Sequence, residues 1–263
     1  MSNAWLGPQP GEELPGDWPS GGPVARVMDV WRAGAPSVDL LAPDIYAQDF
    51  KGICSLYTRS GNPLFIPEAR DQVGNPFWAF GQHSAMGWSV FGIEDLGADG
   101  QVSKAYNMFG EMLPQLAEWQ AAGKVAGVLL LDGEDNQVVS LGGYKVTAAR
   151  PRLTAAGPAT AAPAPLLAGG ISFNSRSLAG DTRPFGLVIN TAPNEFLLIG
   201  SNLSASFALD SPGPGRVAVG TIDEGRFAKG SWLPGRRLNG DEGHSILGSG
   251  SIGMLKIRLY RYE

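Results

Sequence analysis

The pattern of apolar residues changes at Gly123, and this change limits the folds that the chain can adopt. Residues 24–123 alternate between short apolar runs and segments with apolar residues at helical spacing, which indicates strands connected by helices. After Gly123 the apolar residues come in short runs separated by glycine-rich breaks, as in antiparallel β structure. With 37 glycines and 20 prolines among 263 residues, the composition also favours turn-rich β structure. We therefore predict an α/β part, residues 1–123, followed by an all-β part, residues 124–263.

The α/β part contains predicted helices and strands in alternation. Apolar residues at helical spacing predict helices over residues 24–33, 49–58 and 103–123. Ser103 is the expected N-cap of the third helix, which Pro114 is expected to kink and Gly123 to end. Strand-like segments cover residues 38–46, 62–70 and 86–94. Gln82 and His83 are expected in a polar connection before the last of these segments.

Polar and aromatic residues stand where these predicted strands end. The three segments end near Asp44 and Tyr46, at Glu68, and at Trp88 and Glu94. A (β/α)8 barrel presents its catalytic residues in this way, at the carboxyl ends of its strands. Eight such units need about 200 to 250 residues, whereas only about half that length precedes the β part. The chain can therefore supply only part of a TIM barrel.

The part after Gly123 is predicted to form an antiparallel β-sandwich or jelly roll. The predicted strands are Val125–Leu131, Val138–Leu141, Tyr144–Ala148, Phe185–Asn190, Phe196–Ile199, Ala205–Leu209, Val217–Thr221 and Met254–Tyr262. Residues 155–168 consist almost entirely of alanine, proline, glycine and threonine, which offer little shape for a core. We expect this segment to be a flexible loop.

The charge balance argues against two classes of partner. The 20 basic and 25 acidic residues give a net charge of −5, so no overall positive field attracts nucleic acid or an anionic membrane surface. The sequence contains no apolar stretch long enough to span a membrane and no signal peptide at its start. We therefore expect neither nucleic acid nor a membrane as partner.

The thiol and imidazole ligands that structural zinc sites use are scarce. One cysteine, Cys54, cannot form an internal disulfide, and two histidines are a poor ligand set for structural zinc. Cys54 is interpreted as a small buried hydrophobe. The segment with Asn239 and Glu242 lacks the spacing of an EF-hand loop, and a turn in which Arg236 or Arg237 pairs with an acid is expected instead. No metal and no cofactor are predicted.

Several ordered motifs together resemble the second half of the family 35 glycoside hydrolases of the bacterial β-galactosidase type. In the α/β part they are Asn3-Ala-Trp, Pro19-Ser-Gly-Gly-Pro-Val24, Ala42-Pro-Asp-Ile-Tyr46, Gly61-Asn-Pro-Leu-Phe-Ile-Pro-Glu-Ala69 and Phe91-Gly-Ile-Glu-Asp95. In the β part they are Asp223-Glu-Gly-Arg-Phe227, Trp232 through Glu242, and Leu259-Tyr-Arg-Tyr262. The resemblance covers nearly the whole chain and implies barrel strands five to eight followed by a β-rich carboxyl-terminal domain.

The resemblance implies a retaining hydrolase that acts on terminal β-galactosides with two carboxylates. Glu68 matches the position of the nucleophile, which captures an oxocarbenium-like transition state. The acid/base residue of the family lies upstream of the matching region, and no glutamate of residues 1–263 can be assigned that role. We therefore expect the isolated chain to be inactive, since general acid catalysis contributes about 10²- to 10⁴-fold.

Five further residues are candidates for binding the substrate, each with a structural alternative. Asp44 and Tyr46 could bind sugar hydroxyls or position Glu68, or else cap a helix and pack in the core. Trp88 and Phe91 could stack on a sugar ring or belong to the barrel core. His83 could reach the substrate or be a histidine of a loop. A β-galactoside or oligosaccharide is the expected ligand.

Two other functions stay open at this point. The β part could be a non-catalytic carbohydrate-binding or interaction module left from a truncated hydrolase. Alternatively, another chain or a second copy could supply the other barrel strands, because four parallel strands leave two open edges. Enzymes of this family are commonly exported, so the resemblance suggests a periplasmic or extracellular location for a full-length enzyme.

Overall fold

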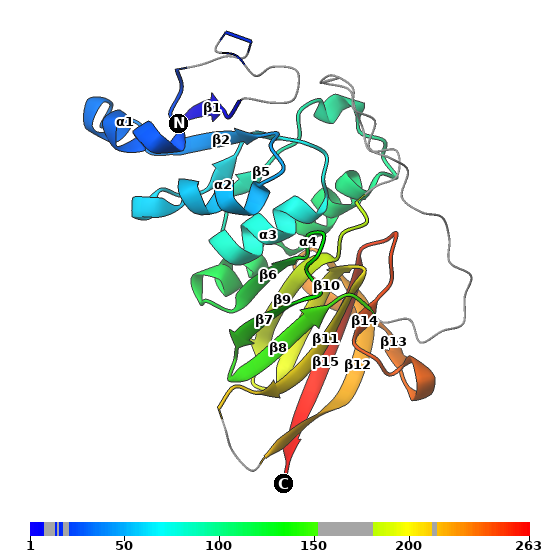
Figure 1. The fold of residues 1–263 in the computed structure, drawn as a ribbon. Coiled ribbons are helices and arrows are strands. Elements are labelled where there is room, and N and C mark those ends of the chain that lie inside the picture. Colours follow the sequence, from blue (N-terminus) through cyan, green and yellow to red (C-terminus); the bar gives the residue numbers. More distant parts are fainter. Residues whose placement is uncertain (8–13, 15, 18–20, 152–180, 212–214) are drawn as a thin grey trace.

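The computed structural model describes residues 1–7, 14, 16–17, 21–151, 181–211 and 215–263. Helices and short parallel strands form one half of the molecule, and antiparallel sheets form the other (Figure 1). Gly123 lies at the boundary between the two, so the predicted combination of an α/β and a β-rich half is confirmed. The loop predicted at residues 155–168 lies outside the described residues.

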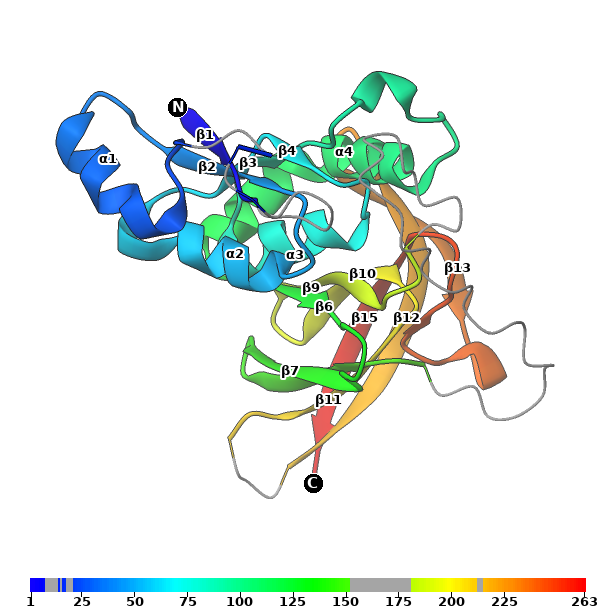
Figure 2. The same cartoon turned by 45° about the horizontal axis from the view of Figure 1, so that its top comes forward.

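The strands of the first half are parallel and follow one another in space as they do in the chain. Its elements are β1 (Ser2–Trp5), α1 (Met28–Gly34), β2 (Leu41–Ile45), α2 (Phe50–Tyr57), β3 (Phe65–Ile66), β4 (Glu68–Ala69), α3 (Gly74–His83), β5 (Gly87–Trp88) and α4 (Gln101–Ala121). Strand β2 pairs with β1 and β4, and β3 pairs with β5. Only Pro67, which has no N–H to donate, separates β3 from β4. The segment 65–69 therefore joins the two sets of paired strands into one parallel layer, of which Figure 2 shows β1 to β4 side by side.

The prediction of a polar connection before β5 is wrong, because helix α3 occupies this part of the chain. Gln82 and His83 form its last turn. The sequence does not predict this helix, because it contains three weak helix formers, Gly74, Pro76 and Gly81. Pro76 is tolerated in the first turn, where its missing N–H would have no partner within the helix.

Helix α4 begins earlier than predicted and ends as predicted. Gly100 is its N-cap, so the prediction of Ser103 is wrong. Ser103 lies in the first turn, and its hydroxyl donates a hydrogen bond of 2.8 Å to the carbonyl of Gly97. The helix continues through Pro114. Its last residue is Ala121, and Gly123 then stops the helix as predicted, with a φ of +64° in the left-handed conformation that glycine adopts without strain.

The β-rich half consists of a six-stranded and a four-stranded antiparallel sheet, as the predicted sandwich requires. The larger sheet has the order β13-β12-β15-β10-β9-β6 and the smaller one β14-β11-β8-β7. Their bounds are β6 (Val125–Leu129), β7 (Asn136–Leu141), β8 (Tyr144–Ala149), β9 (Phe185–Ala192), β10 (Glu195–Ser201), β11 (Leu203–Leu209), β12 (Arg216–Ala228), β13 (Ser231–Leu238), β14 (Ile246–Leu247) and β15 (Gly253–Tyr262). Strand β13 has no counterpart among the predicted strands because Pro234 interrupts its pattern. Proline is tolerated there since β13 is an edge strand.

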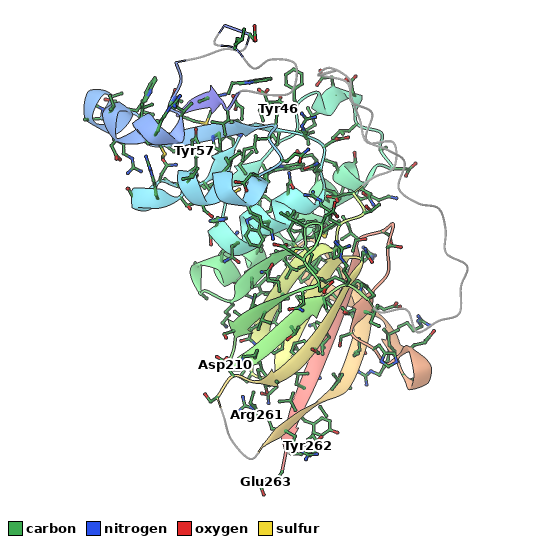
Figure 3. The ribbon with its side chains drawn as sticks, in the orientation of Figure 1. Tyr46, Tyr57, Asp210, Arg261, Tyr262 and Glu263 are labelled. Carbon is green, nitrogen blue, oxygen red and sulfur yellow. The ribbon has the colours of Figure 1, made fainter. Side chains whose placement is uncertain are left out.

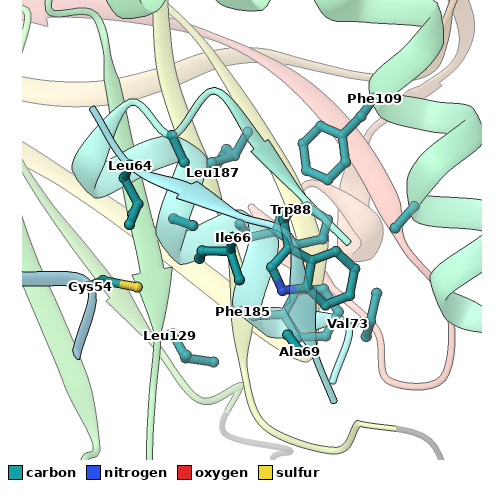
Figure 4. Packing of buried hydrophobic residues seen from close by; sticks show 14 of the residues in the cluster. Cys54, Leu64, Ile66, Ala69, Val73, Trp88, Phe109, Leu129, Phe185 and Leu187 are labelled. Carbon is teal, nitrogen blue, oxygen red and sulfur yellow. The ribbon is translucent and has the colours of Figure 1, made fainter. Parts of the chain in front are cut away.

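Strands β6, β9 and β10 of the six-stranded sheet are buried on both faces. Val188, Phe196 and Leu198 face the four-stranded sheet and share a core with it. Leu187 and Ile199 face the helices and belong to a second core with residues of the α/β half. Figure 4 shows this second core, in which Trp88 and Phe109 pack near Phe185 and Leu187. The two halves therefore share one continuous hydrophobic core across residue 123.

Helix α3 lies directly on β6 through two glycines. A Cβ added to Gly81 would overlap the backbone of Gly127, and a Cβ added to Gly127 would lie 2.8 Å from the carbonyl oxygen of Phe77. Backbone meets backbone at this point, so neither partner can move aside as a flexible side chain would. No helix in the described part of the chain is long and apolar enough to cross a membrane.

We predict that Gly81→Ala destabilises the protein by about 1–3 kcal/mol, because the added methyl group overpacks the contact with β6. Gly110→Ala is the matched control: Gly110 lies in α4, and a Cβ there would meet nothing within 4 Å. The control should stabilise by about 0.5–1 kcal/mol, since alanine is the better helix former. Urea unfolding measures both, and equal effects of the two substitutions would contradict the close contact.

Candidate functional site

The carboxyl ends of β1, β2 and β4 bring a group of polar and aromatic side chains together. Asp44 and Glu68 are direct partners in the parallel register of β2 and β4, and Trp5 is the partner of Asp44 on β1. Tyr46 follows β2 by one residue. Ligands of parallel α/β sheets bind at the carboxyl ends of the strands. The chain therefore places these side chains where a ligand site is expected.

Asp44 is a buried carboxylate held by an amide. Its residue is only 6% exposed, and the Asn3 side chain donates to its two oxygens at 3.0 and 2.9 Å. Burial raises the pKa of Asp44, the hydrogen bond from Asn3 opposes this shift, and the nearby charge of Glu68 adds to it. Asp44 therefore carries its negative charge at a cost in folding stability.

Tyr46 links Asp44's strand to Glu68. Its hydroxyl donates a hydrogen bond to Oε1 of Glu68, and the Tyr46 residue is buried whereas Glu68 is half-buried. Burial raises the pKa of the Tyr46 phenol, and the hydrogen bond to Glu68 and the charges of Glu68 and Asp44 raise it further. The phenol therefore stays protonated at neutral pH and remains a donor to the carboxylate.

Trp5 and Arg70 fix the ring of Tyr46 from other elements. The Trp5 ring stacks on it with centroids 4.8 Å apart and an interplanar angle of 28°. The Arg70 Nε donates to the backbone carbonyl of Tyr46 at 2.7 Å, and the guanidinium lies 5.9 Å from the centre of the ring. With these contacts the hydroxyl that bonds Glu68 has a defined position.

Phe91 and Trp88, the two candidates for stacking on a sugar, occupy different environments. Phe91 is 53% exposed, and its N–H donates to the carbonyl of Ala69 at 3.0 Å, next to Glu68 in the chain. Trp88 is 4% exposed, lies 5.8 Å from the Tyr106 ring and belongs to the core of Figure 4. The exposed ring of Phe91, whose backbone is bonded to the residue after Glu68, suits contact with a ligand, whereas the burial of Trp88 favours packing.

His83 lies apart from the carboxylates. It is the last residue of α3, its Nδ1 is 3.4 Å from the hydroxyl of Thr58, and its ring faces the edge of Trp78. Thr58 caps the end of α2. Helices that connect parallel strands end at the amino-terminal edge of the sheet, so both residues lie at the edge opposite to Glu68. Burial lowers the pKa of His83, which keeps the ring neutral.

Among the described residues, no three or more histidine, cysteine, aspartate and glutamate side chains are grouped as a metal site would require. Cys54 is buried in the core, and burial raises the pKa of its thiol. This agrees with its interpretation as a small hydrophobe. Arg236 pairs with Glu242 at 2.7 Å and Arg237 with Asp223 at 2.7 Å, so the predicted pairing of these arginines with acids is confirmed.

A shallow cavity of about 220 Å³ lies elsewhere, between β11 and β12. Its lining is formed mainly by small and apolar residues, with His244 at one side. No carboxylate lines it, so it lacks the groups that hydrolysis of a glycosidic bond requires.

Two residues of the carboxylate site, Asn3 and Trp5, are not indicated by any local sequence pattern. Both lie on β1, a four-residue strand whose polar and small residues give no strand signal. The only sequence signal for them is the Asn3-Ala-Trp motif, which is part of the resemblance to family 35 glycoside hydrolases. Their partners Asp44 and Tyr46 lie some forty residues further along, beyond the reach of any local pattern.

Comparison with family models assigns more than half of the chain. Residues 102–248 match the family described as a domain of unknown function, DUF5597. The chain belongs to this family. The DUF5597 region starts within α4 and runs through β14, so it contains the sandwich strands except β15, and none of Asp44, Tyr46 and Glu68. No match is found among curated proteins.

We predict that Asp44→Asn makes the protein more stable at neutral pH. The pKa of Asp44 is raised above 3.8, so the folded chain binds more protons than the unfolded chain, and the free energy of unfolding falls as pH rises from 3.8 through the raised value. The variant loses this dependence and keeps an oxygen that accepts from Asn3. Its advantage should grow with pH to an amount on the order of 1 kcal/mol.

Urea unfolding at a series of pH values measures this difference. Asp99→Asn, at an exposed aspartate, is the matched control and should run parallel to the wild type. If the curves of Asp44→Asn and wild type are also parallel from acid to neutral pH, burial does not raise the pKa of Asp44.

Proposed function

We propose that this chain forms the nucleophile half of a β-galactosidase-like retaining glycosidase, with Glu68 as the nucleophile. In this proposal the α/β half corresponds to strands five to eight of a (β/α)8 barrel and the sandwich to the domain that follows the barrel. Two features support it. The motifs of residues 3–95 and 223–262 resemble family 35 glycoside hydrolases, and the parallel strands lie side by side in chain order.

The bond between Tyr46 and Glu68 is the observation on which the proposal depends most. A retaining glycosidase needs an ionised carboxylate that attacks the anomeric carbon, forms a covalent glycosyl-enzyme and later leaves. The Tyr46 hydroxyl donates to Oε1 of Glu68, which holds the carboxylate in position and leaves Oε2 to attack the sugar. The half-buried position of Glu68 at a strand end gives a substrate access to it.

Asp44 has a different role in this proposal. Asn3 donates to both of its oxygens and its residue is almost completely buried, so it is not available to protonate a leaving group. Its charge, beside Glu68 in the register, instead positions Asn3 and keeps the region around the nucleophile negative. A negative environment favours a substrate that becomes an oxocarbenium ion.

The substrate proposed from the resemblance is a terminal β-galactoside, and Phe91 is the aromatic residue proposed to contact it. The acid/base residue is assigned to none of the glutamates of residues 1–263. The remaining barrel strands would come from a partner chain or a second copy that pairs with the outer strands β1 and β5, and the acid/base residue would come from a partner chain of different sequence.

Covalent labelling tests Glu68 without the acid/base residue. The probe is a 2-deoxy-2-fluoro-β-galactoside that carries a dinitrophenolate leaving group. This group departs without protonation, so trapping of the glycosyl-enzyme depends on the nucleophile alone. We predict one adduct per chain, located on the peptide with Glu68, in a mass-spectrometric digest. Glu68→Gln should prevent the adduct and leave the melting curve unchanged.

Glu94→Gln, at an exposed glutamate close to Phe91, is the matched control and should be labelled like the wild type. An adduct on another carboxylate would contradict the assignment of Glu68. A folded wild-type protein that stays unlabelled would favour the non-catalytic module instead.

We predict that Tyr46→Phe slows labelling by about 10- to 100-fold, because a hydrogen bond to a charged group contributes about 1.5–3 kcal/mol. The rate constant of labelling as a function of inhibitor concentration measures the effect. Tyr57→Phe is the control: Tyr57 is also buried, but its hydroxyl donates to the carbonyl of Pro23 at 3.0 Å and not to Glu68. An unchanged rate in Tyr46→Phe would mean that the bond to Glu68 does not support catalysis.

A further inference from the structure

Two tyrosines near the end of β15 are exposed to solvent on the face of the strand that points away from the core between the two sheets. Leu255, Ile257 and Leu259 alternate along β15 and face the core between the two sheets. Tyr260 and Tyr262 are 51% and 44% exposed, and alternation places both on the opposite face. Their ring centres are 5.8 Å apart and their planes are inclined by 40°. They form a pair of neighbouring aromatic surfaces in contact with solvent.

This face is open because the neighbouring strands end before it. Strand β10 pairs with β15 only up to Arg258, and β13 pairs with β12 only from Ile222 onward. Beyond these points β12 and β15 form a two-stranded ribbon, which Figure 1 shows extending toward the carboxyl terminus. Figure 3 shows Arg261 and Tyr262 on opposite sides of β15, with Tyr46 at the far end of the molecule. The tyrosine face is therefore remote from Glu68.

The residues beside the tyrosines are small or carry hydrogen-bond donors. Ala218 is the register partner of Tyr260, and Arg216 is the partner of Tyr262. A Cβ added to Gly220 would lie 3.4 Å from the Tyr260 ring, so a small residue is present there too. The small residues leave the surface flat, and Arg216 is exposed at its rim.

The charges next to this face do not make it an anion site. Arg258 lies on the same face of β15 and pairs with Glu195 at 2.9 Å, and Lys256 is 3.7 Å from the same carboxylate. Glu195 thus balances much of the positive charge. The face combines aromatic rings, phenol hydroxyls and guanidinium N–H groups without a strong field.

We propose that Tyr260 and Tyr262 form a binding face for a neutral oligosaccharide chain, separate from the Glu68 site. A pyranose ring has an apolar C–H face and a rim of hydroxyls, and a tyrosine offers an apolar ring with a polar tip. Two adjacent rings match two successive sugars, and Arg216 and the phenol hydroxyls supply partners for the sugar hydroxyls. The galactan probe chosen below follows from the proposed function, but the face itself does not depend on Glu68.

The size of the face argues against a second copy of the chain as occupant. A tyrosine side chain buries about 150–250 Å² when fully covered, so two half-exposed tyrosines offer about 200 Å². A stable protein interface needs about 800 Å² from each partner. A narrow oligosaccharide needs only a strip of this width.

Affinity electrophoresis in native gels tests the proposal. The wild-type protein is run with and without soluble β-1,4-galactan, with xyloglucan as a second neutral β-linked polysaccharide. We expect retardation by at least one of them, loss of most of it in Tyr260→Ala/Tyr262→Ala, and partial retention in Tyr260→Phe/Tyr262→Phe, which keeps the rings. Circular dichroism melts check that each variant is folded.

Two control variants separate this face from other exposed apolar residues. Val138→Ala removes an exposed apolar residue from β7, and Leu113→Ala removes one from α4; both should be retarded like the wild type. Wild-type mobility unaffected by either polysaccharide overturns the proposal, as does retardation that persists in the double alanine variant. Sedimentation that shows a wild-type dimer and a monomeric double variant also overturns it, in favour of self-association.

Discussion

The contact between Gly81 and Gly127 determines how close the two halves of the molecule lie. Because neither residue has a side chain, the backbone of α3 approaches that of β6 directly. This approach lets Phe77, one turn earlier in α3, pack against Phe185 of β9 and Phe109 of α4, with ring centres 4.8 and 5.0 Å apart. The shared core therefore depends on a backbone contact that any larger residue would widen.

The position of α3 also affects the carboxylate site. Only residues 70–73 separate β4, which carries Glu68, from the first residue of α3. Gly74, the first residue of α3, leaves little room for a larger residue, because an added Cβ would lie 2.9 Å from the side chain of Leu129 on β6. Its N–H donates to the Asp181 carboxylate at 2.9 Å, and Asp181 in turn pairs with Arg183 at 2.7 Å. The helix that follows Glu68 is thus attached to the sandwich at both of its ends, which limits the movement of β4.

The sequence predicts local features of this fold well and long-range ones poorly. The end of α4 at Gly123 and the strands after it follow from glycine conformation and apolar alternation, which depend on neighbouring residues. Helix α3 and strand β13 escape prediction because Pro76, Gly81 and Pro234 have poor intrinsic propensities that tertiary packing overrides. In the site, Glu68 and Tyr46 are predicted as candidates, but their bond, the support from β1 and the different burial of Trp88 and Phe91 arise only when distant strands meet.

The DUF5597 region is energetically linked to the residues before it. Helix α4 lies within the match, and its Phe109 packs against Phe77 and Phe80 of α3 with ring centres 5.0 and 4.8 Å away. Near its other end, Trp119 contacts Phe227 of β12 at 6.0 Å. The part of α4 around Phe109 is therefore buried by the preceding α/β residues, and the part around Trp119 is buried by the sandwich. Cutting the chain at residue 123 would expose the apolar residues of α4 that contact the sandwich, and cutting it at residue 102 would expose those that contact α3. The carboxylate site and the DUF5597 sandwich therefore depend on the same helix for their stability.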